Sequence, residues 1–335
     1  MRIALLTGGS TPERDVALAG AREVARALRE RGHEVTVADT VHGVLDAAGE
    51  AERLARPVGT APPSAAELAA LAAREDLPLL LREPLFRRCD LVFLVLHGRQ
   101  GEGGEVQTLL DLAGLRYTGS GAVGSALAMD KEVAKRLCRH AGIPTADWVL
   151  WPAEETEIAA LGLPLIVKPL AAGSTVGLSV IRDLAALPAA VALAETVDRE
   201  VMLERFLPGR EFSVGVLGDR ALGVGEIVPQ HEIFDYECKY TAGMTDELFP
   251  APIGEELARR LQELALATHR TLKLRDFSRT DLRLDERGEP AVLEANTLPG
   301  LTRMSLLPQS AGVVGIDFGT LCETICQLAL SRPRR

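Results

Sequence analysis

Two strand-like segments near the C-terminal end of the sequence bring acidic, amide and basic side chains together. Arg279 and Asp281 are two residues apart, and so are Glu294 and Asn296. Side chains two residues apart lie on the same face of a strand. In an antiparallel hairpin, a two-residue turn would place Arg279 opposite Glu294, whereas a four-residue turn would place Asp281 opposite Glu294. Either register puts all four side chains on one face.

Carboxylate and amide oxygens on such a face are ligands that Mg²⁺ prefers and shares with nucleotide phosphates. The ordinary alternative is a solvated polar face whose arginine forms surface ion pairs. However, the stretch TLPGLT at 297–302 follows the second strand directly and is too specific for a generic turn. The hairpin is therefore predicted to be functional.

A lysine and a glycine-rich loop indicate phosphate binding in the middle of the chain. Lys168 ends an apolar run and begins the loop KPLAAGSTVG at 168–177. Such a loop offers N–H groups and hydroxyls to phosphate oxygens. It lacks the GK[ST] ending of a Walker A loop and precedes a strand, so we expect it to close over phosphates from a hairpin. A purely structural loop is the alternative, but an inward-facing lysine needs an anionic partner.

Two further segments place polar side chains directly after strands, where α/β proteins bind ligands. Glu13 could hold a substrate ammonium, although interaction with a helix dipole explains it without a ligand. His97 could orient a substrate carboxylate, although a histidine at a strand end is more often structural. Taken alone, both residues favour the structural explanation. In the second segment, Glu102 is a candidate cap for the next helix.

A mixed aromatic and charged segment, FDYECKYT at 234–241, is a poor candidate for a buried strand. It is typical of a functional lid loop. Lys239 and Tyr240 are its candidate contacts to phosphate and substrate.

The elements that must position these side chains alternate between strand and helix at the N-terminal end. Apolar runs at 3–7, 34–38 and 91–96 predict strands, and residues 16–31 predict a helix. A doubly wound parallel sheet is therefore expected, with ligands at the carboxyl ends of its strands. Residues 47–81 predict a loop and then a helix capped by Ser64, but no function.

The remaining chain is a mixture of helices and short strands between turn-rich boundaries at 117–121 and 207–209. One helix is predicted to run through Asp130 and Lys131 to His140. The other elements are predicted by residue range: strands at 165–169, 178–181 and 201–206, helices at 188–196 and 255–273, and a strand pair near residue 290.

Composition excludes several classes of protein. The net charge of −10 argues against a nucleic-acid partner. Five cysteines without CxxC spacing indicate reduced thiols in the cytosol. The apolar run at the N-terminus is too short for a signal peptide, and no stretch approaches the ~20 apolar residues that span a membrane. We therefore expect a cytoplasmic protein with no membrane association.

In order along the chain, these segments resemble the D-alanine–D-alanine ligase family of the ATP-grasp fold. The segments are GGSTPERDVAL, LHGRQGEGGEVQ, YTGSGAVGSALAMDK, VKPLAAGSTVGLS, LERFLPGREFSV, FDYECKYT and LEANTLPGLTRMSLLP. The resemblance covers nearly the whole chain except about residues 42–88. It implies an N-terminal α/β substrate-binding domain at 1–120. Two ATP-grasp subdomains follow, a central one at 121–207 and a C-terminal one at 208–335 that carries the metal and catalytic residues.

The resemblance also implies an ATP site and a metal site. Lys131 and Lys168 match lysines that contact phosphates. The hinge that receives adenine and the acid that binds ribose are matched by Glu204, Phe206, Leu207 and Glu211. The other implied ATP contacts are Gly173, Ser174, Thr175 and Lys239. Ligands of two Mg²⁺ ions, for which Mn²⁺ can substitute, are matched by Asp281, Glu294 and Asn296. Activation by K⁺ is left open.

For the amino-acid substrates, the resemblance gives each end of the site a role. Glu13 matches the residue that holds the first D-alanine's ammonium, and Ser174 with Tyr240 completes a triad linking lid to substrate. Further implied residues are Arg279 and the backbone of Gly300 as oxyanion donors, Ser305 and Leu306 in the pocket for the second D-alanine, and His97 near the first.

The implied reaction joins two D-alanine molecules through an acyl phosphate, releasing ADP and phosphate, for peptidoglycan precursors that build the cell wall and maintain cell shape. A homodimer is also implied. Ligases that take D-lactate, D-serine or another amino acid share nearly every residue above, but Tyr240 favours D-alanine because members that take D-lactate usually lack it. A non-catalytic nucleotide-binding protein is the remaining alternative, which the intact metal ligands, both lysines and Arg279 oppose.

Two positions depart from the family pattern. Gly103 stands where the family usually has an acid. Arg283 replaces an apolar residue near the nucleotide, and its parity with Asp281 predicts that it faces the site and contacts phosphate.

Overall fold

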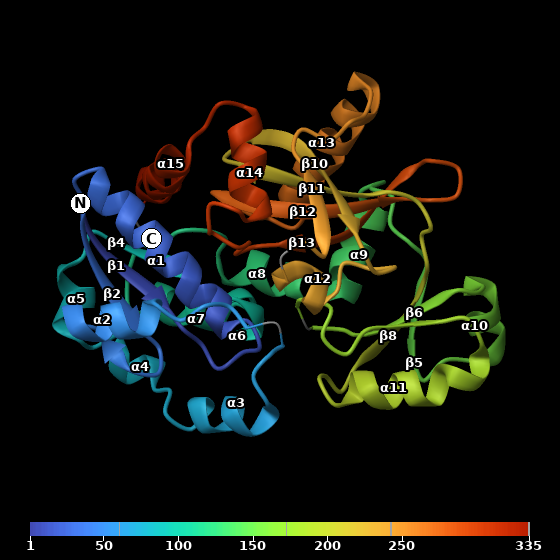
Figure 1. Ribbon diagram of the computed structural model, residues 1–335, viewed down its shortest axis with the longest axis horizontal. Coiled ribbons are helices and arrows are strands. Elements are labelled where there is room, and N and C mark those ends of the chain that lie inside the picture. The colour runs from blue at the N-terminus through green and yellow to red at the C-terminus, as the bar shows by residue number, and fades with distance from the viewer. Residues whose placement is uncertain (60, 172, 242, 334–335) are drawn as a thin grey trace.

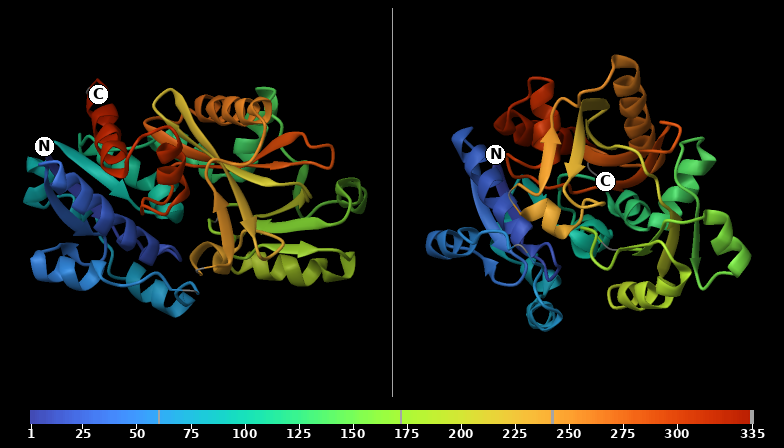
Figure 2. Two further views of the ribbon diagram at one scale, coloured as in Figure 1. Left: turned by 45° about the horizontal axis from the view of Figure 1, so that its top comes forward. Right: turned by 45° about the vertical axis from the view of Figure 1, so that its right-hand side comes forward.

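The computed structural model describes residues 1–59, 61–171, 173–241 and 243–333, except for the side chain of Tyr240. Within these residues the strands form three sheets, which Figure 1 and Figure 2 show as an N-terminal sheet and two antiparallel sheets lying across from one another. The predicted α/β class is confirmed. The predicted domain boundaries at 120 and 207 stay a prediction.

The N-terminal sheet is parallel at its centre. Its strands, in the order β3, β2, β1, β4, are Gly43–Val44, Glu34–Asp39, Arg2–Thr7 and Leu91–Val95. β1 pairs in parallel with β2 and β4, whereas β3 pairs antiparallel at one edge. Apart from Arg2, β1 and β4 are fully buried, which explains their near-continuous apolar sequences. The carboxyl ends of β1 and β4 therefore meet, and the loops carrying Glu13 and His97 leave from there.

Helices from both ends of the chain complete this core. They are α1 (Arg14–Glu30), α5 (Pro84–Arg88), α6 (Gly98–Glu102), α7 (Glu105–Leu112) and α15 (Phe318–Ser331). Leu321 and Ile325 of α15 are buried in the same cluster as Leu5 of β1 and Leu94 of β4. Figure 1 shows α15 lying beside α1. The last helix of the chain thus packs on the first sheet.

The segment without a predicted role folds into short helices beside the N-terminal sheet: α2 (Ala47–Leu54), α3 (Ala65–Ala72) and α4 (Leu77–Leu80). Ser64 caps α3 through a capping box with Glu67, as predicted. Beyond α3, the carboxylate of Glu75 accepts hydrogen bonds from the Ser10 hydroxyl (2.6 Å), the Thr40 hydroxyl (2.5 Å) and the Gln100 amide (2.9 Å). This segment is therefore hydrogen-bonded to the loops that follow β1 and β2 and to α6, the helix after β4.

The chain breaks at Asp130, so the predicted single helix through this position is wrong. α8 spans Ala122–Met129 and α9 spans Lys131–His140. Asp130 is extended (φ −78°, ψ 99°), and its carboxylate accepts from the backbone N–H of Val133 at 2.9 Å. An aspartate capping a helix in this way starts a new helix. Lys131 is consequently the first residue of α9.

The second sheet has the order β5, β8, β6, β7, with strands Trp148–Trp151, Val201–Arg205, Leu165–Pro169 and Ser179–Ile181. One face packs against α10 (Glu155–Leu161) and α11 (Leu187–Glu195), which follows a short 3-10 turn, Leu184–Ala186. Leu165, Val167 and Leu203 point toward these helices. By the alternation of strand side chains, Lys168 and Glu204 point away from them.

The third sheet has the order β11, β10, β9, β12, β13, with strands Thr245–Leu248, Arg220–Pro229, Glu211–Leu217, Phe277–Leu284 and Pro290–Asn296. α13 (Glu255–Thr271) covers one face through Leu261 and Ala265, which contact Leu282 of β12. α14 (Leu306–Val313) also packs closely on this sheet, since a Cβ at Gly223 would lie 2.4 Å from Val313. Arg279, Asp281 and Arg283 alternate with the buried residues of β12 and face away from α13. The remaining helix, α12 (Tyr236–Tyr240), lies between β10 and β11.

A helix that crosses a membrane must be both long and apolar. In the described ranges no single helix meets both requirements, although α14 and α15 meet them together as a pair bent by 100°.

Candidate active site

Two pockets meet in the cleft between the three sheets. The first, with an empty volume of about 850 Å³, lies between the two antiparallel sheets, and the second, about 920 Å³, lies between β13 and the N-terminal loops. Phe234, Lys239 and Glu294 line both. The first is also lined by these predicted residues: Lys131, Lys168, Thr175, Glu204, Phe206, Leu207, Glu211 and Asp281. Those in the second are Glu13, His97, Ser174, Arg279, Asn296, Gly300, Ser305 and Leu306. Gly173 borders a small cavity with Lys131 and Glu294.

A buried carboxylate holds two lysines at the wall of the first pocket. The Nζ of Lys168 donates to Oε2 of Glu204 at 2.6 Å, and Lys135 donates to Oε1 of the same carboxylate. Lys135 also donates to the Thr145 hydroxyl at 2.6 Å. Burial alone would raise the pKa of Glu204, but the two ammonium groups lower it to about 2. Lys168, aimed inward as predicted, is therefore held in place by an internal anion.

Sequence reasoning missed Lys135. It lies in the middle of α9, where a lysine ordinarily faces water, yet it is only 3% exposed. The nearest sequence signal is the four-residue spacing from Lys131, which places both lysines on one face of α9.

At the site, the hairpin has one of the two predicted pairings, that of the four-residue turn, but nearer the turn the pairing differs. Asp281 lies opposite Glu294 and Arg279 opposite Asn296, as the four-residue turn requires. Nearer the turn the register is shifted by one residue, with Leu284 opposite Pro290 and a bulge at Leu293. A bulge lets two residues oppose one on the partner strand. As a result, both Leu293 and Glu294 line the first pocket.

The polar face of the hairpin is tightly paired. The Arg279 guanidinium donates to both oxygens of Asp281, at 2.9 and 2.8 Å, and Asn296 Nδ2 donates to Asp281 at 3.0 Å. Lys131 lies 3.3 Å from Glu294. Burial would raise the pKa of Glu294, but Lys131, Lys239 and other nearby cations lower it to about 2. The carboxylate is therefore ionised at any pH near neutrality.

These oxygens suit a hard divalent cation. Asp281 and Glu294 offer carboxylate oxygens, and Asn296 donates through Nδ2, which leaves its carbonyl oxygen free to accept. Oxygen-only donor sets of this kind select Mg²⁺ over softer metals.

Phe206, Leu207 and Glu211 define the other end of the first pocket. The Arg283 guanidinium faces this pocket, as predicted, and lies 4.8 Å from the centre of the Phe206 ring. Its Nε donates to the carbonyl of Gly209 at 3.0 Å, and its Nη1 lies 3.7 Å from Glu211. These partners place Arg283 at the predicted adenine and ribose end, which argues against the predicted phosphate contact. Burial raises the pKa of Glu211 to about 7 despite the nearby guanidinium.

A hydrogen bond joins the glycine-rich loop to the N-terminal part of the chain. The Ser174 hydroxyl donates to Oε1 of Glu13. Glu13 stands at the start of α1, where interaction with the helix dipole stays an alternative, but its side chain makes no capping hydrogen bond there. A Cβ at Gly173 would lie 2.8 Å from the same carboxylate. Ser174 and Thr175 both have positive φ (50° and 62°), which is strained for residues with side chains.

His97 and Glu102 form hydrogen bonds with the segment that follows the β12–β13 hairpin. The Nδ1–H of His97 donates to the carbonyl of Leu298 at 2.9 Å, which leaves Nε2 as a buried acceptor without a partner among the described residues. Burial lowers the pKa of His97 and keeps the ring neutral. Glu102 does not cap the next helix as predicted. Its carboxylate accepts from the backbone N–H groups of Thr297 and Leu298, at 3.1 and 3.0 Å, and burial raises its pKa to about 7.

The predicted oxyanion and second-substrate residues form one turn. The Ser305 hydroxyl accepts from the backbone N–H of Thr302 at 3.1 Å, and a Cβ at Gly300 would lie 2.9 Å from that hydroxyl. Leu306 begins α14 and is buried. Close approach of the chain at Gly300 leaves its backbone facing the second pocket.

The lid reaches both pockets. The Thr175 hydroxyl donates to the carbonyl of Phe234 at 2.8 Å, and Lys239 Nζ lies 3.3 Å from the same hydroxyl. Tyr240 ends α12, but the prediction for its side chain lies outside the described residues. Val58, from the segment without a predicted role, also lines the second pocket, and nothing in its local sequence indicated this.

Comparison with known proteins agrees with this geometry. Family models described as D-ala D-ala ligase N-terminus and D-ala D-ala ligase C-terminus match residues 2–120 and 137–327. A D-alanine–D-alanine ligase of Synechococcus sp. (strain JA-3-3Ab) is 38% identical over 338 residues, which cover 99% of this chain and 94% of the relative.

Solved structures resemble the chain over nearly its full length. A D-alanine–D-alanine ligase from Bacillus anthracis complexed with ATP has a TM-score of 0.76 and 27% identity, covering 98% of this chain and 97% of the other. A D-Ala:D-Ser ligase from Enterococcus faecalis has a TM-score of 0.79 and 29% identity, covering 98% of both.

Proposed function

The chain belongs to the D-alanine–D-alanine ligase family, and from this premise we propose that it joins two D-alanine molecules into D-alanyl-D-alanine at the expense of ATP. The observation that carries the proposal is the meeting of the two pockets at Phe234, Lys239 and Glu294. A nucleotide in the first pocket and an amino acid in the second would face one another at this junction. Direct transfer of a phosphoryl group requires that arrangement.

The first step activates a carboxylate. Glu13 holds the ammonium of the first D-alanine, and a carboxylate oxygen of that substrate attacks the γ-phosphorus of ATP. The bond from the γ-phosphorus to the bridging oxygen breaks, and ADP leaves as an acyl phosphate forms. Lys168, Lys131 and the backbone of the 173–175 loop neutralise charge on the phosphoryl oxygens. Asp281, Glu294 and Asn296 would hold two Mg²⁺ ions, or Mn²⁺ in their place, and these ions would supply positive charge to neutralise the phosphates.

The second step forms the peptide bond. The ammonium of the second D-alanine, bound near Ser305 and Leu306, releases one proton to solvent; the resulting amine attacks the acyl carbon and passes a second proton to the departing phosphate. Arg279 and the backbone N–H of Gly300 stabilise the oxyanion of the tetrahedral intermediate, which collapses as phosphate leaves. Closure of the lid that carries Lys239 and Tyr240 keeps water from hydrolysing the acyl phosphate.

The assay that tests this function is ADP release by the purified full chain with ATP and Mg²⁺. We expect turnover with D-alanine alone and none with L-alanine, and we expect Glu294→Gln to abolish it. D-Lactate or D-serine added as second substrate should compete poorly; the similar D-Ala:D-Ser ligase makes D-serine the necessary comparison. ATP binding without turnover on any amino acid would instead support a non-catalytic nucleotide-binding protein.

A homodimer in the cytoplasm completes the proposal. Sedimentation of the purified chain at micromolar concentration tests the dimer, because a single species at 35.9 kDa would exclude it.

A further inference from the structure

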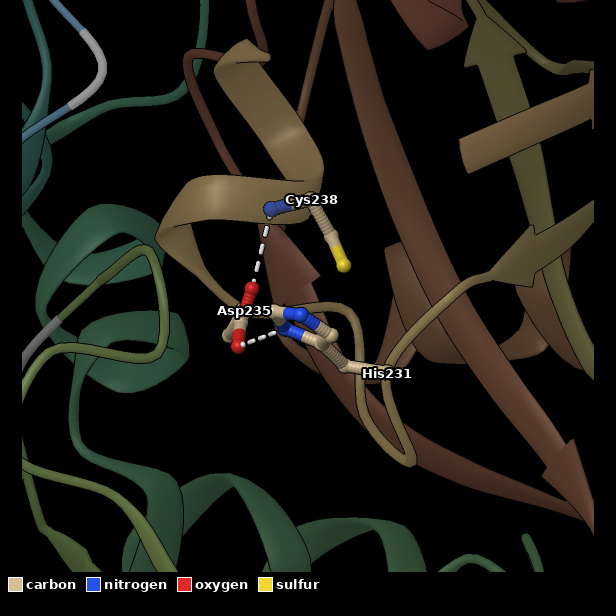
Figure 3. A group of neighbouring side chains, drawn as sticks. All are labelled: His231, Asp235 and Cys238. Atoms are coloured by element: carbon tan, nitrogen blue, oxygen red, sulfur yellow. Dashed lines mark hydrogen bonds and ion pairs between the residues drawn. The ribbon is translucent and has the colours of Figure 1, made fainter. Parts of the chain in front are cut away.

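A histidine, an aspartate and a cysteine converge at residues 231–238, just before and within the predicted lid loop at 234–241, and none of them has a role above. His231 precedes α12, Asp235 caps its start, and Cys238 lies in its first turn. Figure 3 shows the three side chains gathered at the start of this helix. One potential ligand atom from each lies within 4.8 Å of the others.

Hydrogen bonds already orient two of the three groups. Nδ1 of His231 lies 2.7 Å from Oδ2 of Asp235, and Oδ1 of Asp235 accepts the backbone N–H of Cys238 at 2.9 Å. The hydrogen bond between Asp235 and His231 raises the pKa of His231. Oδ2 and the imidazole are in direct contact, so a cation bound by both would take the place of the proton that they share.

We propose that His231, Asp235 and Cys238 form a Zn²⁺ site in the lid. A thiolate, an imidazole and a carboxylate together suit a borderline-soft cation. By contrast, Asp281, Glu294 and Asn296 offer only oxygen atoms. Three protein ligands leave a fourth tetrahedral position for water.

The geometry requires a small adjustment. Zn²⁺ bonds of about 2.0–2.3 Å need ligand atoms roughly 3.3–3.8 Å apart in a tetrahedron. The widest separation, up to 4.8 Å, must therefore close by about 1 Å, whereas His231 Nδ1 and Asp235 Oδ2, 2.7 Å apart, must separate by about as much. Rotation of His231 allows both movements because its side chain is 39% exposed. Binding displaces the proton of the Cys238 thiol, and that of His231 when the ring is protonated, so affinity rises with pH.

If the chain has the proposed function, metal bound at this position affects its catalytic rate. Asp235 follows Phe234, and Cys238 precedes Lys239, the lid residues that line both pockets. A metal bridging His231 and Cys238 fixes the segment between them. Since a lid must open to release product, bound Zn²⁺ slows turnover.

Binding is tested first, independently of activity, on untagged full-length protein. Equilibrium dialysis against Zn²⁺ measures metal content, and Co²⁺ in its place reports thiolate coordination through a sulfur-to-cobalt charge-transfer band. We expect Cys238→Ala and His231→Gln each to weaken binding about tenfold or more and the first to abolish the band. Cys89→Ala is the matched control, since it removes a half-buried thiol elsewhere, and it should change neither. Binding unchanged in both lid variants, or Co²⁺ bound by the wild type without the band, would overturn the site.

Activity is tested second, with saturating Mg²⁺ present. We expect Zn²⁺ to slow ADP release by the wild type and to have a weaker effect on Cys238→Ala. Equal inhibition of the two proteins would place the inhibitory Zn²⁺ elsewhere and overturn the effect on the lid. A wild type that binds Zn²⁺ but turns over no substrate would refute the proposed function and leave the metal site standing.

Discussion

Arg283 lies beside Phe206 at the end of the first pocket where we propose that the nucleoside binds. Its guanidinium lies over the Phe206 ring and is fixed by the Gly209 carbonyl. A guanidinium held in this way presents a flat cationic surface on which an aromatic base can stack.

Replacing this residue should therefore weaken ATP binding. For Arg283→Met we expect the KM for ATP to rise about tenfold, or ~1.4 kcal/mol, with the KM for D-alanine unchanged. Arg205→Met is a matched control, because this half-exposed arginine also lines the pocket but binds a carbonyl of α10. An unchanged KM for ATP in Arg283→Met would exclude the contact.

Glu211 makes nucleotide binding depend on pH. Burial raises the pKa of this carboxyl from its ordinary value to about 7, so it is protonated below pH 7 and ionised above it. The ionised form can accept hydrogen bonds from the ribose hydroxyls with both oxygens, and its negative charge strengthens these bonds. We expect the KM for ATP to fall as pH rises from 6 to 8, more steeply in the wild type than in Glu211→Gln.

The comparison between the two proteins isolates the carboxyl group. ATP phosphates also titrate in this range, but both proteins share that contribution. Identical pH profiles for the wild type and Glu211→Gln would show that this carboxyl does not titrate in the nucleotide complex.

At the scale of elements, Glu75, between α3 and α4, connects the short helices at 47–80 to the rest of the N-terminal part of the chain. Its carboxylate accepts three side-chain hydrogen bonds, from the loops after β1 and β2 and from α6, and Val58 of the same segment lines the second pocket, where we propose that the amino acids bind. The segment thus contributes to the wall of the second pocket through Val58.

Cutting this attachment should affect one substrate more than the other. For Glu75→Ala we expect a higher KM for D-alanine, an unchanged KM for ATP and a loss of about 1–3 kcal/mol in the free energy of unfolding. Exposed Glu52 of α2 provides the control variant, Glu52→Ala, which should match the wild type in kinetics and urea unfolding. A similar rise in both KM values would indicate general loosening of the protein.

Elements were easier to predict than their local irregularities. The strands at 3–7 and 91–96 are buried apolar runs, and alternation in β12 and β13 was enough to place Arg279, Asp281, Glu294 and Asn296 on one face. The break at Asp130 depends on a capping hydrogen bond, and the bulge at Leu293 on how the turn closes. Lys135 was missed because its burial depends on Glu204 from a distant strand. Of these, the break at Asp130 left the clearest local signal, because aspartate is a favoured N-cap residue.

At the scale of the whole molecule, α15 ties the two ends of the chain together. Ile325 is fully buried in the cluster that contains β1 and β4, far from it in sequence. The N-terminal sheet therefore lacks part of its core until the last helix has docked.

This packing predicts a large effect from a distant substitution. Ile325→Ala should lower the free energy of unfolding by about 2–5 kcal/mol and increase hydrogen exchange in β1 and β4. Leu112→Ala removes a leucine that is 81% exposed and should leave both unchanged. Normal protection of β1 and β4 in Ile325→Ala would show that the N-terminal sheet is stable without this contact.

Cationic and anionic side chains around the two pockets are already paired with one another. Lys168 binds Glu204, Lys131 lies against Glu294, and Arg279 binds Asp281. An incoming polyphosphate must take these cations from carboxylates that already hold them, and an arriving divalent cation must take the carboxylates in turn. Binding of the nucleotide would thus exchange one set of ion pairs for another with little change in the net charge of the pocket. This favours binding of the nucleotide together with its metal over binding of either one alone.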